Sequence, residues 1–238
     1  MITALYIAAA LLPAAFLMRY IYRQDRVEKE PAGLLICLIP LGALAGLIAG
    51  VLNEFGISLL SLFFSSEEST GYILALAFLV VGVVEEGCKF LMLRLATWNN
   101  PNFNFRFDGV VYAVFVSLGF AALENVVYVF AYGLSVAITR AFLSVPAHMG
   151  FAVFMGSYYG RAKICEASGD RRGISRNLFL GYLTAVFLHG FYDSCAMSSG
   201  TISLLLFAGF VLIMYIVVIR RIRREADTDC MIDPSVLF

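Results

Sequence analysis

Apolar residues fill this chain in seven long runs, and short polar segments separate them. The runs cover approximately residues 2–17, 31–52, 71–95, 109–132, 141–159, 178–197 and 202–219. A helix needs about 20 mainly apolar residues to cross the hydrocarbon core of a bilayer, and most of these runs approach or exceed that length. The pattern predicts an all-α fold, a polytopic bundle of about seven transmembrane helices.

The composition agrees with a membrane protein. Hydrophobic residues make up 61% of the 238 positions, charged residues make up 14%, and the mean hydropathy is +0.86; soluble domains carry about 25% charged residues. The formal net charge is zero, so no global positive field indicates a nucleic-acid partner. The five cysteines are scattered without a CxxC pair, which argues against a disulfide framework or a cysteine-built zinc site.

The basic residues predict the orientation of the bundle. Cytoplasmic loops carry an excess of Lys and Arg, and with the N-terminus outside, all of the 17 basic residues except Arg140 and Lys89 fall in cytoplasmic segments. We therefore expect an outer N-terminus, a cytoplasmic C-terminus and, because the outer loops are short, one integral-membrane domain over residues 1–238. Residues 53–64 follow a run that already spans the bilayer, and we expect them to form a short interfacial helix.

Glycines recur at four-residue spacing in two of the predicted helices. They are Gly42, Gly46 and Gly50, and then Gly156 and Gly160. Small residues at this spacing let helix backbones approach closely, so we interpret both series as helix-packing positions.

Ionisable residues interrupt four of the apolar runs. Each charge at the bilayer centre costs about 2.5–3.5 kcal/mol on insertion scales, so such residues face a bundle interior or a water-filled cavity. Both histidines of the chain are among them. The set comprises Glu85, Glu86 and Lys89, then Glu124 beside Asn125, then His148, and finally His189 and Asp193. Four neighbouring helices that each contribute a polar group predict one shared site.

The segment EEGCK sets two carboxylates against one ammonium group. Glu85 and Glu86 lie four and three residues before Lys89, so either can pair with it on a helix. The carboxylate that is left over has the character of a general base, and the sequence leaves open which of the two it is. His189 lies four residues before Asp193, which allows Asp193 to hold one ring nitrogen and to direct the other inward.

This set of residues favours the activation of water. The chain has no HExxH pair and no Gly-rich phosphate loop. A carboxylate can take a proton from water while imidazoles, with or without a metal, stabilise the oxyanion that forms on an attacked carbonyl. With a metal, His148, His189 and Glu124 would supply the three ligands of an open catalytic zinc site. The predicted substrate is a peptide bond that enters the membrane plane.

The ordered motifs resemble those of the PrsW family of intramembrane proteases, within the wider group of CAAX prenyl proteases and Abi proteins. They are EEGCK at 85–89, FAALEN at 120–125, a histidine in the next span and HGFYD at 189–193. The resemblance covers nearly the whole chain and implies a helical intramembrane metalloprotease. It assigns the water-activating position to Glu85 and Glu86, the ion-pair position to Lys89, the second-motif position to Glu124, and the later polar positions to His148, His189 and Asp193.

The resemblance also implies a partner and a location. Substrates of PrsW-like proteins include single-pass anti-sigma factors cut on the outer side, which implies a regulatory role in a bacterial cytoplasmic membrane. The CAAX branch carries motifs that resemble EExxxR and FxxxH. In this chain Lys89 stands one residue before the position of the arginine, and Glu124 stands in place of the histidine. The identity of the metal ligands and the requirement for a metal therefore stay open. The sequence also leaves the cleavage site and the oligomeric state open.

Two other classes of protein use buried polar residues. A proton-coupled transporter would employ the same Glu, His and Asp residues as a relay, and it often shows inverted repeats with interrupted helices, which are not evident here. A non-catalytic membrane scaffold would tolerate Glu85→Gln and His189→Ala. Substrate cleavage, measured against ion flux in liposomes, separates the protease from the transporter.

Overall fold

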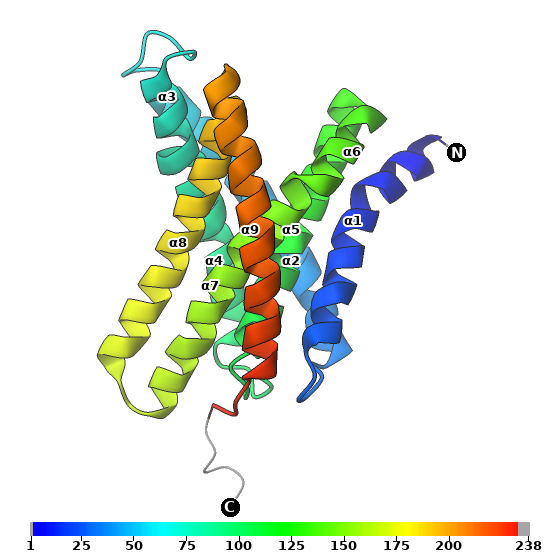
Figure 1. Cartoon of the computed structure of the whole chain (residues 1–238), viewed down its shortest axis with the longest axis vertical. Coiled ribbons are helices and arrows are strands. Elements are labelled where there is room, and N and C mark those ends of the chain that lie inside the picture. Colours follow the sequence, from blue (N-terminus) through cyan, green and yellow to red (C-terminus); the bar gives the residue numbers. More distant parts are fainter. Residues whose placement is uncertain (1, 233–238) are drawn as a thin grey trace, which may run out of the picture.

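The computed structural model describes residues 2–232, and within them it contains helices and one isolated bridge, between Phe105 and Met231. Figure 1 shows the helices running along the long axis of the molecule. In chain order they are α1 (Ile2–Gln24), α2 (Ala32–Leu60), α3 (Thr70–Ala75), the π-helix η1 (Leu76–Gly82), α4 (Val83–Thr97), α5 (Asp108–Tyr132), α6 (Leu134–Phe142), α7 (Ser144–Ala167), α8 (Arg171–Met197) and α9 (Thr201–Asp227). The predicted all-α fold class is confirmed.

The described helices form seven consecutive rods. α3, η1 and α4 follow one another without a break, and α6 joins α7 at Leu143. Five rods are long and apolar enough to cross a membrane: Thr3–Gln24, Ala32–Leu60, Asp108–Tyr132, Leu134–Ala167 and Thr201–Asp227. Of the other two, 70–97 is divided into α3, η1 and α4, none of which is long enough by itself, and α8 contains the polar motif HGFYD, which lowers its hydropathy. The fold is that of an integral membrane bundle.

The loops separate the charges between the two ends of the bundle. In Figure 1 α1 starts at the upper end and α9 finishes at the lower end. The lower end collects the α1–α2, α4–α5 and α7–α8 connections and the end of α9. Together with the helix turns beside them, these segments include most of the arginines and lysines. This arrangement agrees with the positive-inside pattern, and the outer position of the N-terminus stays a prediction.

The expected interfacial helix at 53–64 is wrong over 53–60, because α2 continues without a break to Leu60. No proline lies between residues 53 and 60, and Ser58 Oγ donates to the Glu54 carbonyl within the helix. The 29 residues of α2 span about 43 Å at 1.5 Å per residue. This extension places Asn53 beside the EEGCK segment.

α5 is the central helix, and glycine contacts fix it between α2 and α7. A Cβ on Gly42 would lie 2.0 Å from the carbonyl oxygen of Val116, and a Cβ on Gly156 would lie 2.5 Å from the carbonyl oxygen of Gly109. Side chains essentially never approach so closely, so only glycine fits at these positions. The helix-packing interpretation is confirmed for Gly42 and Gly156.

The remaining glycines of the two series differ in how closely other helices and loops approach them. A Cβ on Gly160 would lie 2.1 Å from the carbonyl oxygen of Arg106, and one on Gly46 would lie 3.2 Å from the side chain of Leu123. By contrast, nothing lies within 4 Å of a Cβ on Gly50, which instead lines a cavity. The packing interpretation is therefore wrong for Gly50.

Candidate active site

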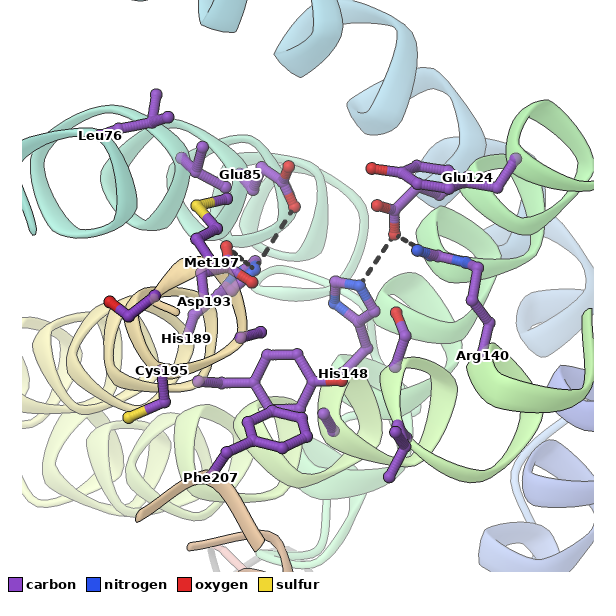
Figure 2. Close-up of a pocket in the computed structure, with 18 of the residues that line it drawn as sticks. Leu76, Glu85, Glu124, Arg140, His148, His189, Asp193, Cys195, Met197 and Phe207 are labelled. Atoms are coloured by element: carbon purple, nitrogen blue, oxygen red, sulfur yellow. Dashed lines mark hydrogen bonds and ion pairs between the residues drawn. The ribbon is translucent and has the colours of Figure 1, made fainter. Parts of the chain in front are cut away.

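A cavity of about 1210 Å³ lies in the half of the bundle that contains the start of α1. Its wall is formed by residues of α2, η1, α4, α5, α6, α7, α8 and α9. Glu86 and Lys89 are buried behind this wall. Polar residues that line the cavity are labelled in Figure 2: Glu85, Glu124, Arg140, His148, His189 and Asp193. Asn53 lines it as well.

The π-helix η1 determines how α4 faces α8. A Cβ on Gly82 would lie 3.1 Å from a backbone oxygen of α8, and one on Gly190 would lie 2.5 Å from a ring atom of η1, so these two glycines let the rods approach closely. π-helical turns change the register of a helix and are frequent at functional sites. The next turn carries Glu85 and Glu86, and it therefore lies against His189, the neighbour of Gly190.

Glu86 is fully buried and is committed to two partners. Its Oε1 lies 2.7 Å from Lys89 Nζ and 2.8 Å from His189 Nδ1. Glu86 therefore neutralises Lys89 and accepts a hydrogen bond from one imidazole nitrogen. The other nitrogen of His189, Nε2, lies on the cavity side, 3.3 Å from Asp193 Oδ2 and 3.8 Å from Glu85 Oε2. The inner nitrogen is therefore held by Glu86 and not, as the spacing predicted, by Asp193.

Glu85 has looser contacts and faces the cavity. Its Oε1 accepts a hydrogen bond of 3.3 Å from Asn53 Nδ2. Its Oε2 lies 3.7 Å from Lys89 Nζ and 3.8 Å from His189 Nε2, and it has no hydrogen-bond partner among the described residues. Adjacent residues point about 100° apart on a helix, so the two glutamates have different surroundings. Glu86 makes short contacts with Lys89 and His189 through Oε1, while its Oε2 has no hydrogen-bond partner among the described residues; Glu85 makes only longer contacts and faces the cavity.

The second histidine is held by a chain of polar contacts on the opposite wall. His148 Nε2 lies 3.0 Å from Glu124 Oε2, which in turn lies 2.7 Å from Arg140 Nη2. Arg140 Nε donates to Asn125 Oδ1 at 2.6 Å. The other ring nitrogen, His148 Nδ1, lies 3.1 Å from Lys89 Nζ. Arg140 and Glu124 thus orient the imidazole, as carboxylates behind metal-bound histidines do.

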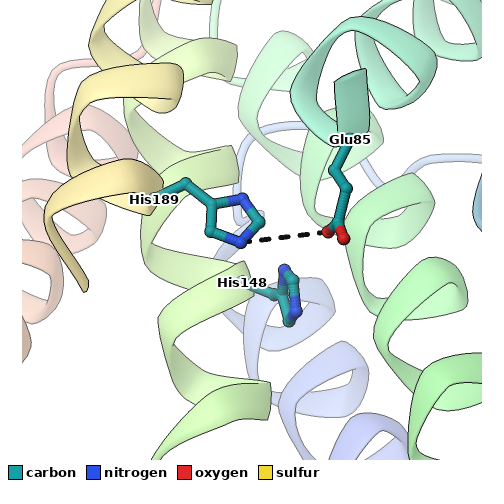
Figure 3. A group of neighbouring side chains, drawn as sticks. All are labelled: Glu85, His148 and His189. Carbon is teal, nitrogen blue, oxygen red and sulfur yellow. Dashed lines mark ion pairs between the residues drawn. The ribbon is translucent and has the colours of Figure 1, made fainter. Parts of the chain in front are cut away.

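The two histidines therefore share one design. Each ring has one nitrogen on its own carboxylate, and Figure 3 shows the other nitrogen turned toward Glu85. The ring of Phe151 stacks on His189 with centroids 4.9 Å apart, and Asp193 Oδ2 lies 3.3 Å from His189 Nε2. Contacts on several sides thus restrain the imidazole of His189.

The group fits a divalent metal ion. One donor atom from each of Glu85, His148 and His189 lies within 4.8 Å of the others, and two imidazoles with one carboxylate are a known ligand set of zinc hydrolases. With both imidazoles neutral, the connected site has two more carboxylates than cations, a charge that a divalent ion would balance. These charged residues are Glu85, Glu86, Glu124, Asp193, Lys89 and Arg140.

This geometry differs from the ligand set expected from the sequence. Glu124 lies outside the group that could hold a metal, because Arg140 and the far nitrogen of His148 occupy its carboxylate. The group that could hold a metal contains Glu85 instead. Two residues that contribute to the site, Arg140 and Asn53, were not predicted. Arg140 could have been recognised as the single basic residue in the predicted outer segments, whereas Asn53 belongs to none of the motifs.

The chain resembles known proteins over most of its length. The model of the PrsW family intramembrane metalloprotease matches residues 30–220. The chain is 34% identical to Protease PrsW of Shouchella clausii (strain KSM-K16), over 92% of this chain and 96% of that protein. It is 33% identical to Protease PrsW of Clostridioides difficile (strain 630), over 87% of this chain and 85% of that protein. It is 32% identical to Protease PrsW of Bacillus subtilis (strain 168), over 79% of this chain and 80% of that protein. No solved structure matches it. The chain belongs to the PrsW family of intramembrane metalloproteases.

Proposed function

We propose that Glu85 is the water-activating carboxylate of this intramembrane protease, and that Glu85, His148 and His189 hold a zinc ion. The observation that carries the proposal is the shared design of the two histidines, each with one nitrogen on a separate carboxylate and the other facing Glu85. A zinc ion held there would act as a Lewis acid and lower the pKa of bound water.

The roles of the protein groups follow from their contacts. A carboxylate has two oxygens, so one oxygen of Glu85 can serve the ion while the other takes the proton of the attacking water and returns it to the amine nitrogen that leaves. Glu86 and Glu124 select the imidazole tautomers, because each accepts a hydrogen bond from one ring nitrogen, which therefore keeps its proton. Lys89 neutralises Glu86 and lies 3.1 Å from His148 Nδ1, so it must move aside when that nitrogen binds a metal. Asp193, on the cavity wall, borders the same reaction centre.

The proposed substrate is a single-pass membrane protein of the bacterial cytoplasmic membrane, and an anti-sigma factor is the first candidate. Two features support this class. The cavity lies at the end of the bundle predicted to face outward, and it is lined by apolar residues of α8 and α9 as well as by the polar site. A substrate segment that leaves the bilayer there would place a peptide bond beside Glu85. The proton-coupled transporter has no support from the family relationship.

A cleavage assay tests the proposal. Single-pass anti-sigma factors tagged at both ends are incubated in liposomes with the purified chain, either wild type or Glu85→Gln, in water enriched in ¹⁸O. Hydrolysis by the wild type alone, with ¹⁸O in the new carboxyl terminus, is the expected result. Equal cleavage by both proteins would contradict the role of Glu85. Cleavage only of other single-pass proteins would keep the chemistry and replace the substrate.

A further inference from the structure

A second cavity, of about 390 Å³, lies at the opposite end of the bundle and is lined chiefly by arginines. The arginines come from three parts of the chain: the segment before α5, the last half of α7, and the end of α9. They are Arg106, Arg161, Arg220, Arg221 and Arg224, accompanied by Val217, Glu225 and Thr228. We call this site the arginine pocket. The protease chemistry described above makes no use of it.

Two of the guanidinium groups are fixed by the protein. Arg221 Nε donates to Ser157 Oγ at 2.9 Å, and its guanidinium lies 4.7 Å from the ring centroid of Phe154. Arg106 Nη2 donates to the carbonyl and, at 3.0 Å, to the hydroxyl of Thr228. Guanidinium groups held in this way bind an anion with little further loss of side-chain entropy.

The protein leaves the positive charge of the pocket largely unbalanced. Glu225 is the single carboxylate in the wall, and it lies 3.7 Å from Arg106, 3.5 Å from Arg161 and 3.7 Å from Arg221. None of these contacts is a hydrogen bond, and Glu225 Oε2 and Arg106 Nε have no hydrogen-bond partner among the described residues. Five guanidinium groups with one carboxylate thus retain a surplus of four positive charges and many free donors.

The position of the pocket along α9 matches the phosphate layer of a membrane. The apolar part of α9, residues 202–219, measures about 27 Å at 1.5 Å per residue, close to the hydrocarbon thickness of about 30 Å. Arg220, Arg221 and Arg224 follow directly. Val217, which is 41% exposed, forms the edge of the pocket nearest the hydrocarbon.

We propose that the arginine pocket binds the phosphate group of an anionic phospholipid, with an acyl chain passing over Val217 along α9. Guanidinium groups bind phosphate oxygens in pairs of charge-assisted hydrogen bonds, and basic pockets between transmembrane helices on the cytoplasmic side recognise anionic headgroups. The apolar edge favours a lipid over a free phosphate ion. A bound lipid would join α7, α9 and the segment before α5.

Native mass spectrometry of the full chain tests this proposal. The protein is equilibrated in detergent with phosphatidylglycerol or phosphatidylcholine, and retained lipid is counted. The test variant is Arg161→Gln/Arg224→Gln. The matched control, Arg171→Gln/Arg172→Gln, removes the same charge from the exposed start of α8. We expect the wild type and the control to retain phosphatidylglycerol in preference to phosphatidylcholine, and the test variant to bind it about tenfold or more weakly.

A further variant and a comparison with inorganic phosphate distinguish the remaining explanations. Arg221→Lys keeps the charge but loses the planar fork, so it should also weaken retention; its thermal unfolding midpoint shows that it is folded. The thermal unfolding midpoint is also measured with inorganic phosphate and with chloride at equal ionic strength. A stabilisation by phosphate alone that equals that of the lipid, and that is lost in the test variant, would replace the lipid by a free anion. Equal loss in the control, or equal retention of the two lipids, would overturn the proposal.

Discussion

Replacing Glu85 and Glu86 one at a time by Gln should separate activity from stability, although the two residues are adjacent. Glu86 neutralises Lys89 at 2.7 Å in a setting where the two side chains are 1% and 2% exposed. Breaking such a buried pair costs about 3–5 kcal/mol. Since Glu85 and His148 Nδ1 still contact Lys89, we expect the lower end, about 3 kcal/mol. For a chain of this size that is roughly 6–12 °C in the unfolding midpoint.

Glu85→Gln should behave in the opposite way. The nearest cation lies 3.7 Å from its Oε2, and that oxygen has no hydrogen-bond partner among the described residues. Removing the charge therefore costs little stability, and we expect the midpoint to stay within about 2 °C of wild type. Loss of a general base lowers the rate by about 10²–10⁴-fold, so cleavage should fall by that factor.

The assay combines thermal unfolding in detergent with single-turnover cleavage of a reconstituted single-pass substrate. Because the rate is read at a temperature where all variants are folded, a stability loss in Glu86→Gln does not imitate a chemical defect. The reasoning is refuted if Glu85→Gln keeps wild-type cleavage, or if Glu86→Gln is as stable as wild type while Glu85→Gln unfolds early.

Three other predictions concern residues around the site and in the scaffold. Arg140→Gln should slow cleavage about 10–100-fold, because Glu124 loses the partner that orients it, and Arg140→Lys should recover part of the rate; unchanged cleavage in Arg140→Gln would contradict this. Burial raises the pKa of Glu30 to about 7 from the value of 4.5 in an unfolded chain, so the folded state keeps a proton that the unfolded state loses, and stability should fall as the pH rises between these values. Glu30→Gln should reduce that slope in a pH series of unfolding midpoints. The part that remains comes from Asp25, whose pKa burial raises to about 6, and an unaltered slope would exclude a contribution of Glu30. Gly156→Ala should lower stability by about 1–3 kcal/mol or more through overpacking against α5, whereas Gly50→Ala, which points into open space, should be tolerated; equal unfolding midpoints would contradict the packing.

Sequence patterns predicted the helical bundle and the gathering of buried polar residues in one place for one physical reason. Charges in a hydrocarbon environment are so costly that Glu85, Glu124, His148 and Asp193 within apolar runs had to mark the interior. The structure brings all four to one cavity. The same reasoning found His189 through its four-residue spacing from Asp193, and these two side chains are in contact.

The choice of partners could not be predicted, because it depends on how the helices are rotated. Helical spacing allowed either Glu85 or Glu86 to pair with Lys89, and only the register after η1 turns Glu86 toward His189. Glu124 looked like a metal ligand because the sequence did not show that Arg140, on another helix, holds it. The spacing of residues along one helix can be taken from the sequence, whereas contacts between helices that are distant in the sequence are known only from the fold.

The most direct test of the proposed centre is the metal content of the purified protein, measured by elemental mass spectrometry after equilibration with zinc. We predict about one zinc per chain in the wild type. The ion should be lost in Glu85→Ala, His148→Ala and His189→Ala. Glu124→Gln should keep it at saturating zinc with an affinity about 10–100-fold weaker, because Glu124 only orients His148. Zinc that persists in Glu85→Ala but disappears in Glu124→Gln would contradict the assignment and would make Glu124 the third ligand.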